Sequence, residues 1–261
     1  MQALKIAATG MAAQQTRVDV TSNNIANMST TAYDRRRAAF ADLFYQQLRA
    51  PGALSATSGE RVPVGVELGL GTRVDAVIVD QAQGALRATG ASLDLAIQGE
   101  GFFEINLPDG NSAYTRDGSF QRSAEGVIVT DAGFPLAGDI TIPIEAESVQ
   151  IAADGTVSAI FQDDGRTEEI GQIDLVRFVS PAGLSALGDT LFAETEASGP
   201  PAIDRPGVDG RGTLRQGFLE DSAVDVVREI TDLIEAQRGY ELNARVMSAA
   251  DEMLSAAVRV R

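Results

Sequence analysis

Residues 230–258 read ITDLIEAQRGYELNARVMSAADEMLSAAV, and residues 4–25 read LKIAATGMAAQQTRVDVTSNNI. In both stretches one set of positions recurs at alternating spacings of four and three residues, which places these side chains on one narrow side of a helix. A stripe this narrow buries too little surface to stabilise a helix on its own. Each helix therefore needs a partner, either the other helix or the helices of neighbouring copies. The two stripes are Leu4, Ala8, Met11, Gln15, Val18, Ser22 and Ile25, and Ile230, Leu233, Gln237, Tyr240, Ala244, Met247, Asp251, Leu254 and Val258.

The middle of the chain is patterned as β-strand from about residue 73 to residue 217. Short alternating or apolar runs are separated by turn residues, among them five Asp-Gly pairs, which favour hairpin turns. This pattern predicts an antiparallel sheet domain, either a sandwich or an irregular barrel. The pairs begin at Asp109, Asp117, Asp154, Asp164 and Asp209.

Two segments join the helices to this β region. Residues 40–48 carry apolar side chains on one helical face and predict a short helix, whereas the glycine- and proline-rich residues 50–72 predict an extended stretch with a strand near Val62 to Leu68. Asp221 and Ser222 are candidate N-caps of the C-terminal helix, with Asp225 in its first turn.

These patterns predict an α+β fold, in which a discontinuous coiled-coil domain of the two terminal helices has an all-β domain inserted in it. We expect residues 1–33 and 222–261 to form the helical core, and residues 34–75 to link it to the rest. The linking segment would hold the short helix and a possible β-hairpin. Residues 76–221 would form the antiparallel outer domain.

The composition excludes most enzyme classes. The chain has no Cys, His or Trp, and Lys5 is its only lysine. Zinc sites, Ser-His-Asp triads and thiol chemistry therefore lack their residues, and nothing in the pattern selects a pair of catalytic carboxylates. We expect no catalytic site, no metal and no cofactor. A net charge of −16 argues against nucleic-acid binding, and no stretch is apolar enough to insert in a membrane.

Short polar residues follow the N-terminal helix. Their side chains bond to nearby backbone and favour helix ends and turns, so the chemistry alone favours a structural cap over a recognition element. The residues concerned are Asn23, Asn24, Asn27, Thr30 and Tyr33.

This polar motif, together with several later ones, resembles the bacterial flagellar rod and hook proteins, the axial proteins of the basal body. The resemblance covers nearly the whole chain. The length of the chain and its residues 45–52 are most similar to the distal rod members. Ala32-Tyr33-Asp34 stands where Gly-Phe-Lys is usual, and Gly239 where Ala is usual. The other matching stretches are residues 69–74, 83–84, 89–97, 99–103, 114–120, 216–220, 235–243 and 250–254.

The resemblance implies a structural subunit of the distal rod, with hook or proximal rod protein as the alternative. Such subunits polymerise into an open, hollow helical shaft that transmits motor torque across the periplasm and serves as an export channel. The implied partners are further copies of this chain, proximal rod proteins, hook protein, the surrounding P- and L-rings and a rod cap during assembly. We also expect export without a cleaved signal peptide, because the stripe of the first helix continues unbroken through residues 6–25.

The resemblance assigns several expected roles. The apolar members of both stripes would form the assembly seam, with Gln15 and Gln237 setting its register. The stretch from Ala50 to Gly71 would span neighbouring subunits. Acidic side chains at Asp163, Asp164, Glu168, Glu169 and Glu194 would keep the outer surface from adhering to the rings, although a general role in solubility explains them equally well. Residues expected to face the lumen or an adjacent helix are Gln14, Gln15, Gln237, Asn243 and Arg245.

Overall fold

A computed structural model describes residues 2–52, 63–138, 140–161 and 166–259. It has an N-terminal helix, a central all-β region and a C-terminal helix, so the α+β class is confirmed. The chain divides into two compact units. The helical unit comprises Met1–Ala26, Arg36–Val79 and Asp225–Arg261, and the β unit comprises Asn27–Arg35 and Asp80–Val224.

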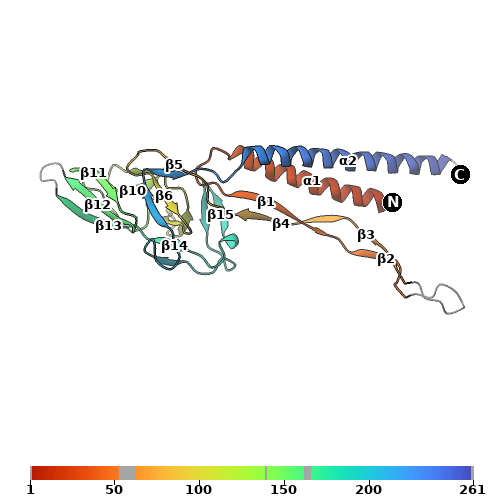
Figure 1. Cartoon of the computed structure of the whole chain (residues 1–261), viewed down its shortest axis with the longest axis horizontal. Coiled ribbons are helices and arrows are strands. Elements are labelled where there is room, and N and C mark those ends of the chain that lie inside the picture. Colours follow the sequence, from red (N-terminus) through yellow and green to blue (C-terminus); the bar gives the residue numbers. More distant parts are fainter. Residues whose placement is uncertain (1, 53–62, 139, 162–165, 260–261) are drawn as a thin grey trace. The chain divides into compact units, whose positions relative to one another are not determined.

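The helical unit is built on helices α1 (Gln2–Ala26) and α2 (Val226–Arg259), which lie side by side (Figure 1). They run antiparallel, because Asn24 near the end of α1 meets Glu229 at the start of α2, and Gly10 meets Asn243. Within the described ranges, neither helix is long and apolar enough to cross a membrane.

Four strands of the same unit form a long ribbon that is two strands wide and consists of two consecutive strand pairs. Strand β1 (Arg35–Asp42) pairs with β4 (Thr72–Asp80), and β2 (Tyr45–Arg49) pairs antiparallel with β3 (Val66–Gly69). Two backbone hydrogen bonds, from Leu43 to Gly71 and from Leu70 to Phe44, continue the pairing between the two parts.

The helix predicted over residues 40–48 is therefore wrong, since these residues lie mostly in β1 and β2. Phe40, Phe44 and Tyr45 favour strands, and pairing with residues some 20 to 40 positions later overrides a local helical spacing. The strand expected near Val62 to Leu68 is present as β3, although Val62 itself lies outside the described residues.

The β unit contains short sheets of two to four strands among the described residues, not two extended sheets. Its four-stranded sheet has the order β15-β16-β8-β7, and its three-stranded sheet the order β11-β12-β13. The remaining pairs are β5 with β19, β6 with β18, β9 with β10, and β14 with β17. The bounds are β5 Leu86–Ala88, β6 Leu95–Gln98, β7 Phe103–Asn106, β8 Ser112–Thr115, β9 Phe120–Arg122, β10 Ile128–Thr130, β11 Ala146–Ile151, β12 Thr156–Phe161, β13 Thr167–Gln172, β14 Leu175–Arg177, β15 Ser185–Gly188, β16 Leu191–Ala193, β17 Ala202–Asp204, β18 Thr213–Gln216 and β19 Phe218–Glu220, with a 3₁₀ turn at Pro181–Gly183.

One large apolar cluster holds these small sheets together. Its members come from many different strands, so each sheet buries one face in a shared core. A second, smaller cluster consists of Phe102, Tyr114, Val176 and Phe178. The ring of Phe178 makes edge-to-face contacts with those of Phe102 and Tyr114. The fully buried large side chains of the main cluster include Leu95, Ile97, Phe103, Ile105, Ile128, Ile140, Ile142, Ile173 and Leu175.

Two of the Asp-Gly pairs make the expected hairpin turns. Gly110 between β7 and β8, and Gly155 between β11 and β12, both have positive φ. Asp117-Gly118 serves another purpose, because a Cβ on Gly118 would lie 1.7 Å from the carbonyl oxygen of Leu95. Glycine is needed there for the close approach of two chain segments. The pair at Asp164 lies outside the described residues.

The N-cap of α2 is Asp225, and not Asp221 or Ser222 as predicted. The Asp225 carboxylate accepts hydrogen bonds from the backbone N–H groups of Val227 and Arg228, at 3.0 and 3.3 Å. Asp221 instead pairs with Arg87 in the β unit. The sequence offered three polar residues within five positions, and only the start of the helix decides among them.

Asp225→Ala should lower the stability of α2 by about 1 kcal/mol, because two backbone N–H groups lose their acceptor. Ser222→Ala is the matched control and should change stability by no more than about 0.5 kcal/mol. Chemical denaturation followed by helical circular dichroism measures both. Equal effects of the two substitutions would show that Asp225 is not the cap.

Candidate functional site

The contact between α1 and α2 uses a heptad stripe of small and polar residues. On α1 it includes the buried residues Ala7, Thr21 and Asn24, and on α2 the buried residues Glu229, Ala236 and Ala250. Their spacings are those of the predicted stripes, but each position lies one residue earlier. Gly10, Gln14, Arg17, Asp232, Gly239 and Asn243 complete the two rows through contacts across the pair.

At one end of the pair, Asn24 joins three elements. Its Nδ2 donates to Glu229 Oε2 at 2.9 Å and to the carbonyl of Arg36 at 2.8 Å, and its Oδ1 accepts from the backbone N–H of Arg36 at 3.0 Å. Asn24 and Glu229 are both 1% exposed. Asn24 therefore connects α1 to α2 and to the start of β1, which is more than the helix cap that the sequence indicated.

Arg17, about two helical turns before Asn24 on α1, bridges two carboxylates of α2. Its Nη2 lies 2.8 Å from Asp232 Oδ1 and 3.1 Å from Glu235 Oε2. These side chains are partly exposed, so the pairing contributes more to the alignment of the helices than to their stability. Arg17, Asp232 and Glu229 were not among the predicted site residues, although opposite charges one residue before each predicted stripe were a visible signal.

The predicted assembly seam lies beside this contact. Leu4, Met11, Val18 and Ile25 of α1 are half-buried. On α2, Ile230 is 46% and Tyr240 43% exposed. Ala8 is exposed, and Leu233, Met247 and Leu254 are half-buried. None of the ten is fully buried in the chain alone, and their role in assembly stays a prediction.

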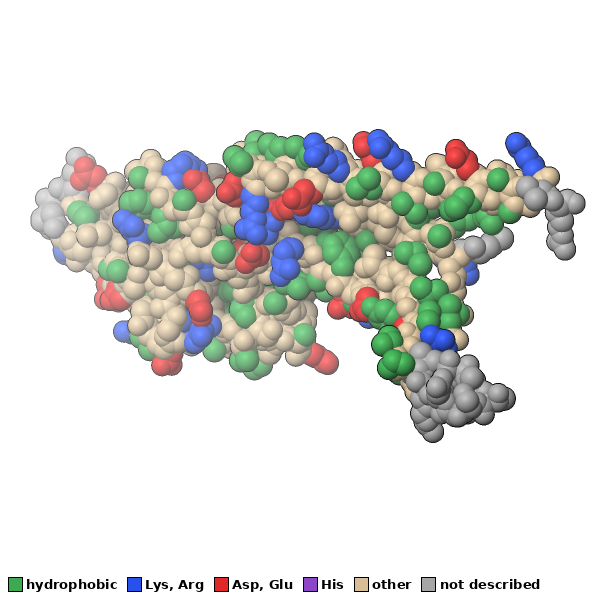
Figure 2. Space-filling model, turned by 45° about the vertical axis from the view of Figure 1, so that its right-hand side comes forward, with side chains coloured by type: hydrophobic (Ala, Val, Ile, Leu, Met, Phe, Trp, Pro, Cys, Tyr) green, Lys and Arg blue, Asp and Glu red, His purple; other side chains and the backbone are tan. Residues whose placement is uncertain are grey.

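Large apolar side chains are exposed elsewhere on the helical unit. Figure 2 shows hydrophobic side chains gathered along the helices and along the ribbon. Exposed apolar surface of this extent marks an interaction surface. On the ribbon its members are Phe40, Phe44, Tyr45, Leu48, Val64, Val66, Leu68, Leu70, Val77 and Ile78, and on the helices Ile6, Val227, Ile230, Ile234, Tyr240, Leu242, Val246, Met253 and Val258.

The candidate lumen residues occupy different environments. Gln14 and Asn243 contact the partner helix of the same chain, where they lie against Gly239 and Gly10 respectively. Gln15, Gln237 and Arg245 are exposed. The candidates thus divide into two that serve the pair of helices and three that are free to face a neighbour or a lumen.

Asn23 is exposed on α1, whereas Asn27, Thr30 and Tyr33 lie in a turn of the β unit. Asn27 Oδ1 accepts a hydrogen bond from Thr30 Oγ1, and the carbonyl of Tyr33 accepts from the N–H of Ala223. Ala32 is buried with a φ of +52°, a conformation that favours glycine. Glycine, which the resemblance leads us to expect here, adopts this conformation without strain.

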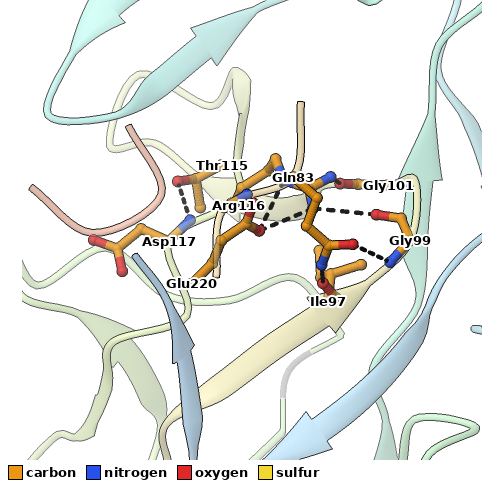
Figure 3. Close-up of polar contacts among 9 residues, drawn as sticks. Gln83, Ile97, Gly99, Gly101, Thr115, Arg116, Asp117 and Glu220 are labelled. Atoms are coloured by element: carbon orange, nitrogen blue, oxygen red, sulfur yellow. Dashed lines mark hydrogen bonds and ion pairs between the residues drawn. The ribbon is translucent and has the colours of Figure 1, made fainter. Parts of the chain in front are cut away.

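In the β unit, motifs that are far apart in the sequence meet around Arg116 (Figure 3). Arg116 donates to Glu220 Oε2 at 2.9 Å and to the carbonyls of Gly99 and Gly101 at 3.1 Å each. Glu220 also accepts from the N–H of Gly84 at 2.8 Å. The two charged side chains are only 11% and 4% exposed, so the ion pair is buried.

A glutamine extends this polar cluster. Gln83 donates to the carbonyl of Ile97 at 2.6 Å and accepts from the N–H of Gly99 at 3.2 Å. Gln216 acts similarly at β18, where it donates to the carbonyls of Ser92 and Val149. Buried backbone groups must be paired, and these side chains supply the pairs that the short sheets leave open.

A cleft of about 410 Å³ opens beside the cluster. Two lining arginines are paired with carboxylates, Arg116 with Glu220 and Arg177 with Glu100. In the ranges that the structure describes, no group of three or more acidic side chains is placed to hold a metal ion. Within this cleft, Arg116 and Gln83 bond to main-chain carbonyls and so join separate segments of the β unit.

Arg116→Met should lower the stability of the β unit by about 3–5 kcal/mol, because Glu220 would keep a buried charge without its partner. Arg87→Met is the control, since its bridge to Asp221 is about half-exposed and should contribute less than about 1 kcal/mol. Urea denaturation of the full chain measures both. Similar losses for both variants would contradict the structural role of the buried pair.

Two groups near this cluster have shifted pKa values. Burial raises the pKa of Tyr114 to about 12, with smaller contributions from Glu104 and Glu194, so the phenol stays neutral. Burial also raises the pKa of Asp117 above its ordinary value of 3.8. Hydrogen bonds from the N–H and hydroxyl of Ser119 partly offset this effect.

Asp117→Asn should stabilise the β unit at pH 7, because the native state disfavours the charged carboxylate. A raised native pKa means that folding is favoured by protonation, so the advantage of Asn is full above that raised pKa. The advantage should shrink as the pH falls through the raised pKa and be lost below 3.8, where the unfolded Asp is protonated as well. Stability curves at pH 7 and pH 3 measure this, and a gain that does not depend on pH would contradict it.

Three family models match separate parts of the chain. The model described as "Flagella basal body rod protein" matches residues 4–33, and the "Flagellar hook protein FlgE/F/G D1 domain" matches residues 96–159. The "Flagellar basal body rod FlgEFG protein C-terminal" matches residues 215–260. The helices and the β unit described above thus have the sequence features of flagellar axial proteins.

Full-length relatives define the family more closely. The chain is 46% identical to the flagellar basal-body rod protein FlgG of Caulobacter vibrioides, over all of both chains. It is 45% identical to FlgG of Agrobacterium fabrum, over 98% of this chain and 97% of that one. FlgF of C. vibrioides is 34% identical, over 92% of this chain and 90% of that one. The chain belongs to the flagellar basal-body rod protein family, and it is a structural subunit, not an enzyme.

Proposed function

We propose that this chain is a subunit of the distal rod, a hollow and stiff shaft that carries motor torque across the periplasm to the hook and provides the export channel. The support is the full-length similarity to FlgG proteins, which exceeds the similarity to FlgF of the same organism. Proximal rod protein and hook protein remain the alternatives. The proposed neighbours are further copies of this chain, the proximal rod and the hook.

The terminal helices would provide the contacts between copies as an inner coiled-coil tube. The small and polar stripe is used within the chain, whereas the apolar stripe one residue later stays half-exposed or exposed on both helices. Its burial would favour association by about 25 cal/mol for each Å² removed from water. The proposed domains keep the bounds inferred from the sequence, with residues 1–33 and 222–261 as the core, 34–75 as the link and 76–221 as the outer wall.

The ribbon would reach from one subunit to the next. All five residues of β2 are exposed, including Tyr45 and Leu48, so this strand pair has too little apolar cover of its own. Part of the proposed spanning segment, residues 53–62, lies outside the described residues. We propose that packing against neighbouring copies covers the exposed side chains and stiffens the shaft.

The outer surface would turn inside the P- and L-rings. Glu168, Glu169 and Glu194 are exposed, which supports low adhesion, while Asp163 and Asp164 lie outside the described residues. Contact with a rod cap during assembly and export without a cleaved signal peptide complete the proposal.

Electron microscopy of basal bodies from cells lacking this chain tests the assignment. A short rod stump without a hook is the expected result. A full-length rod that lacks only the hook would instead indicate a hook or junction protein, and intact flagella would overturn the proposal.

Leu233→Asp should abolish incorporation into the rod while the isolated chain keeps its helices, because Leu233 lies on the half-exposed stripe. Ala236→Asp is the matched comparison, since Ala236 is fully buried against α1 and a charge there should disrupt the helix pair itself. Met11→Asp on α1 should behave like Leu233→Asp.

Circular dichroism of the purified variants and basal-body microscopy separate the two effects. Normal rods built from both Leu233→Asp and Met11→Asp would remove the proposed role of the apolar stripe.

A further inference from the structure

We infer that Gly10 and Asn243 form a register lock between α1 and α2, in which an amide side chain fills the notch left by a glycine on the opposite helix. This goes beyond the proposed place in the rod, because it concerns how a single chain aligns its two ends. The observation that carries it is the close contact between Gly10 and the side-chain amide of Asn243.

A larger residue at position 10 would require the Asn243 side chain to move. A Cβ built on Gly10 would lie 2.8 Å from Asn243 Oδ1 and 3.0 Å from both Cγ and Nδ2. Asn243 is short and is held in place, because its Nδ2 donates to the carbonyl of Gly239 at 2.9 Å. The asparagine is therefore less free to move aside than a longer side chain, and a shift would strain or break this hydrogen bond.

A glycine inside a helix otherwise needs an explanation. It costs about 1 kcal/mol relative to alanine, roughly a fivefold change in the helix equilibrium. Gly10 lies in the interior of the helix Gln2–Ala26. Close packing of Asn243 accounts for glycine at this position.

The lock distinguishes the native register from its nearest alternatives. A heptad stripe tolerates slippage by seven residues, because the same face stays in contact. Such a slip would bring Asn243 opposite Ala3 or Arg17, and Gly10 opposite Ala236 or Ala250. Only the native register places the asparagine opposite a glycine, and it also keeps Asn24 against Glu229.

Gly239 provides a built-in comparison. A Cβ there would lie 3.1 Å from Gln14 Cδ and 3.3 Å from its Oε1, which are the far atoms of a flexible side chain. Gln14 Oε1 is buried without a hydrogen-bond partner, so little holds this side chain in place. The notch at Gly239 therefore tolerates alanine, whereas the notch at Gly10 selects for glycine.

The test is a pair of substitutions made alone and together in the full chain. Gly10→Ala alone should favour unfolding of the helices or shift their register, despite the higher helix propensity of alanine. In the Asn243→Ala background the same Gly10→Ala change should favour folding by roughly fivefold, because only propensity remains. Gly239→Ala is the matched control and should leave the register unchanged.

Register is read from spin labels. The chain has no native cysteine, so Ser22→Cys and Thr231→Cys, both at exposed positions, place one label on each helix. A slip of one heptad moves the labels by about 10 Å along the axis, which electron–electron distance measurement resolves. Helical circular dichroism under denaturant gives the equilibrium for each variant.

A reversal of the sign of the Gly10→Ala effect between the two backgrounds is the expected result. An equal effect in both backgrounds, a stabilised Gly10→Ala single variant with unchanged register, or a wild-type chain without a defined label distance would overturn the lock. These measurements use the isolated chain, so their outcome is separate from that of basal-body microscopy.

Discussion

The close approach of α1 and α2 is the contact on which the helical unit depends. It is possible because the two helices face each other with glycine, alanine and short polar side chains, not with large apolar ones. A pair closed by its large apolar residues would have little left to bury against another copy. Here the intrachain contact uses one stripe and leaves its apolar neighbour partly open, as suits a family of axial proteins that self-assemble.

The sequence predicts the period of these helices but not the phase of their contact. Both stripes on each helix repeat every seven residues, and they differ by a single position. The apolar one is visible because hydrophobic residues stand out from their surroundings. The stripe used in the contact includes Gly10, Gln14 and Arg17 with Asp232, Gly239 and Asn243, and no hydrophobic contrast reveals it.

In the β unit, features that depend on neighbouring residues can be predicted from the sequence, whereas contacts between distant segments cannot. Alternation and Asp-Gly pairs predict β12 and the turns at Gly110 and Gly155, because these features depend on neighbouring residues. The meeting of Arg116 with Glu220 depends on segments over a hundred residues apart. The short helix predicted within residues 40–48 failed for the same reason, since its pairing partners lie in β3 and β4.

The polar residues of the matching motifs have a physical explanation within the β unit. Sheets of two strands leave both outer edges with unpaired backbone groups, and a core built from such sheets buries some of them. Arg116, Gln83 and Gln216 bind five main-chain carbonyls between them. Long polar side chains thus do what additional strands do in a larger sheet. In this chain the polar residues of the matching motifs therefore join short strands into one β unit.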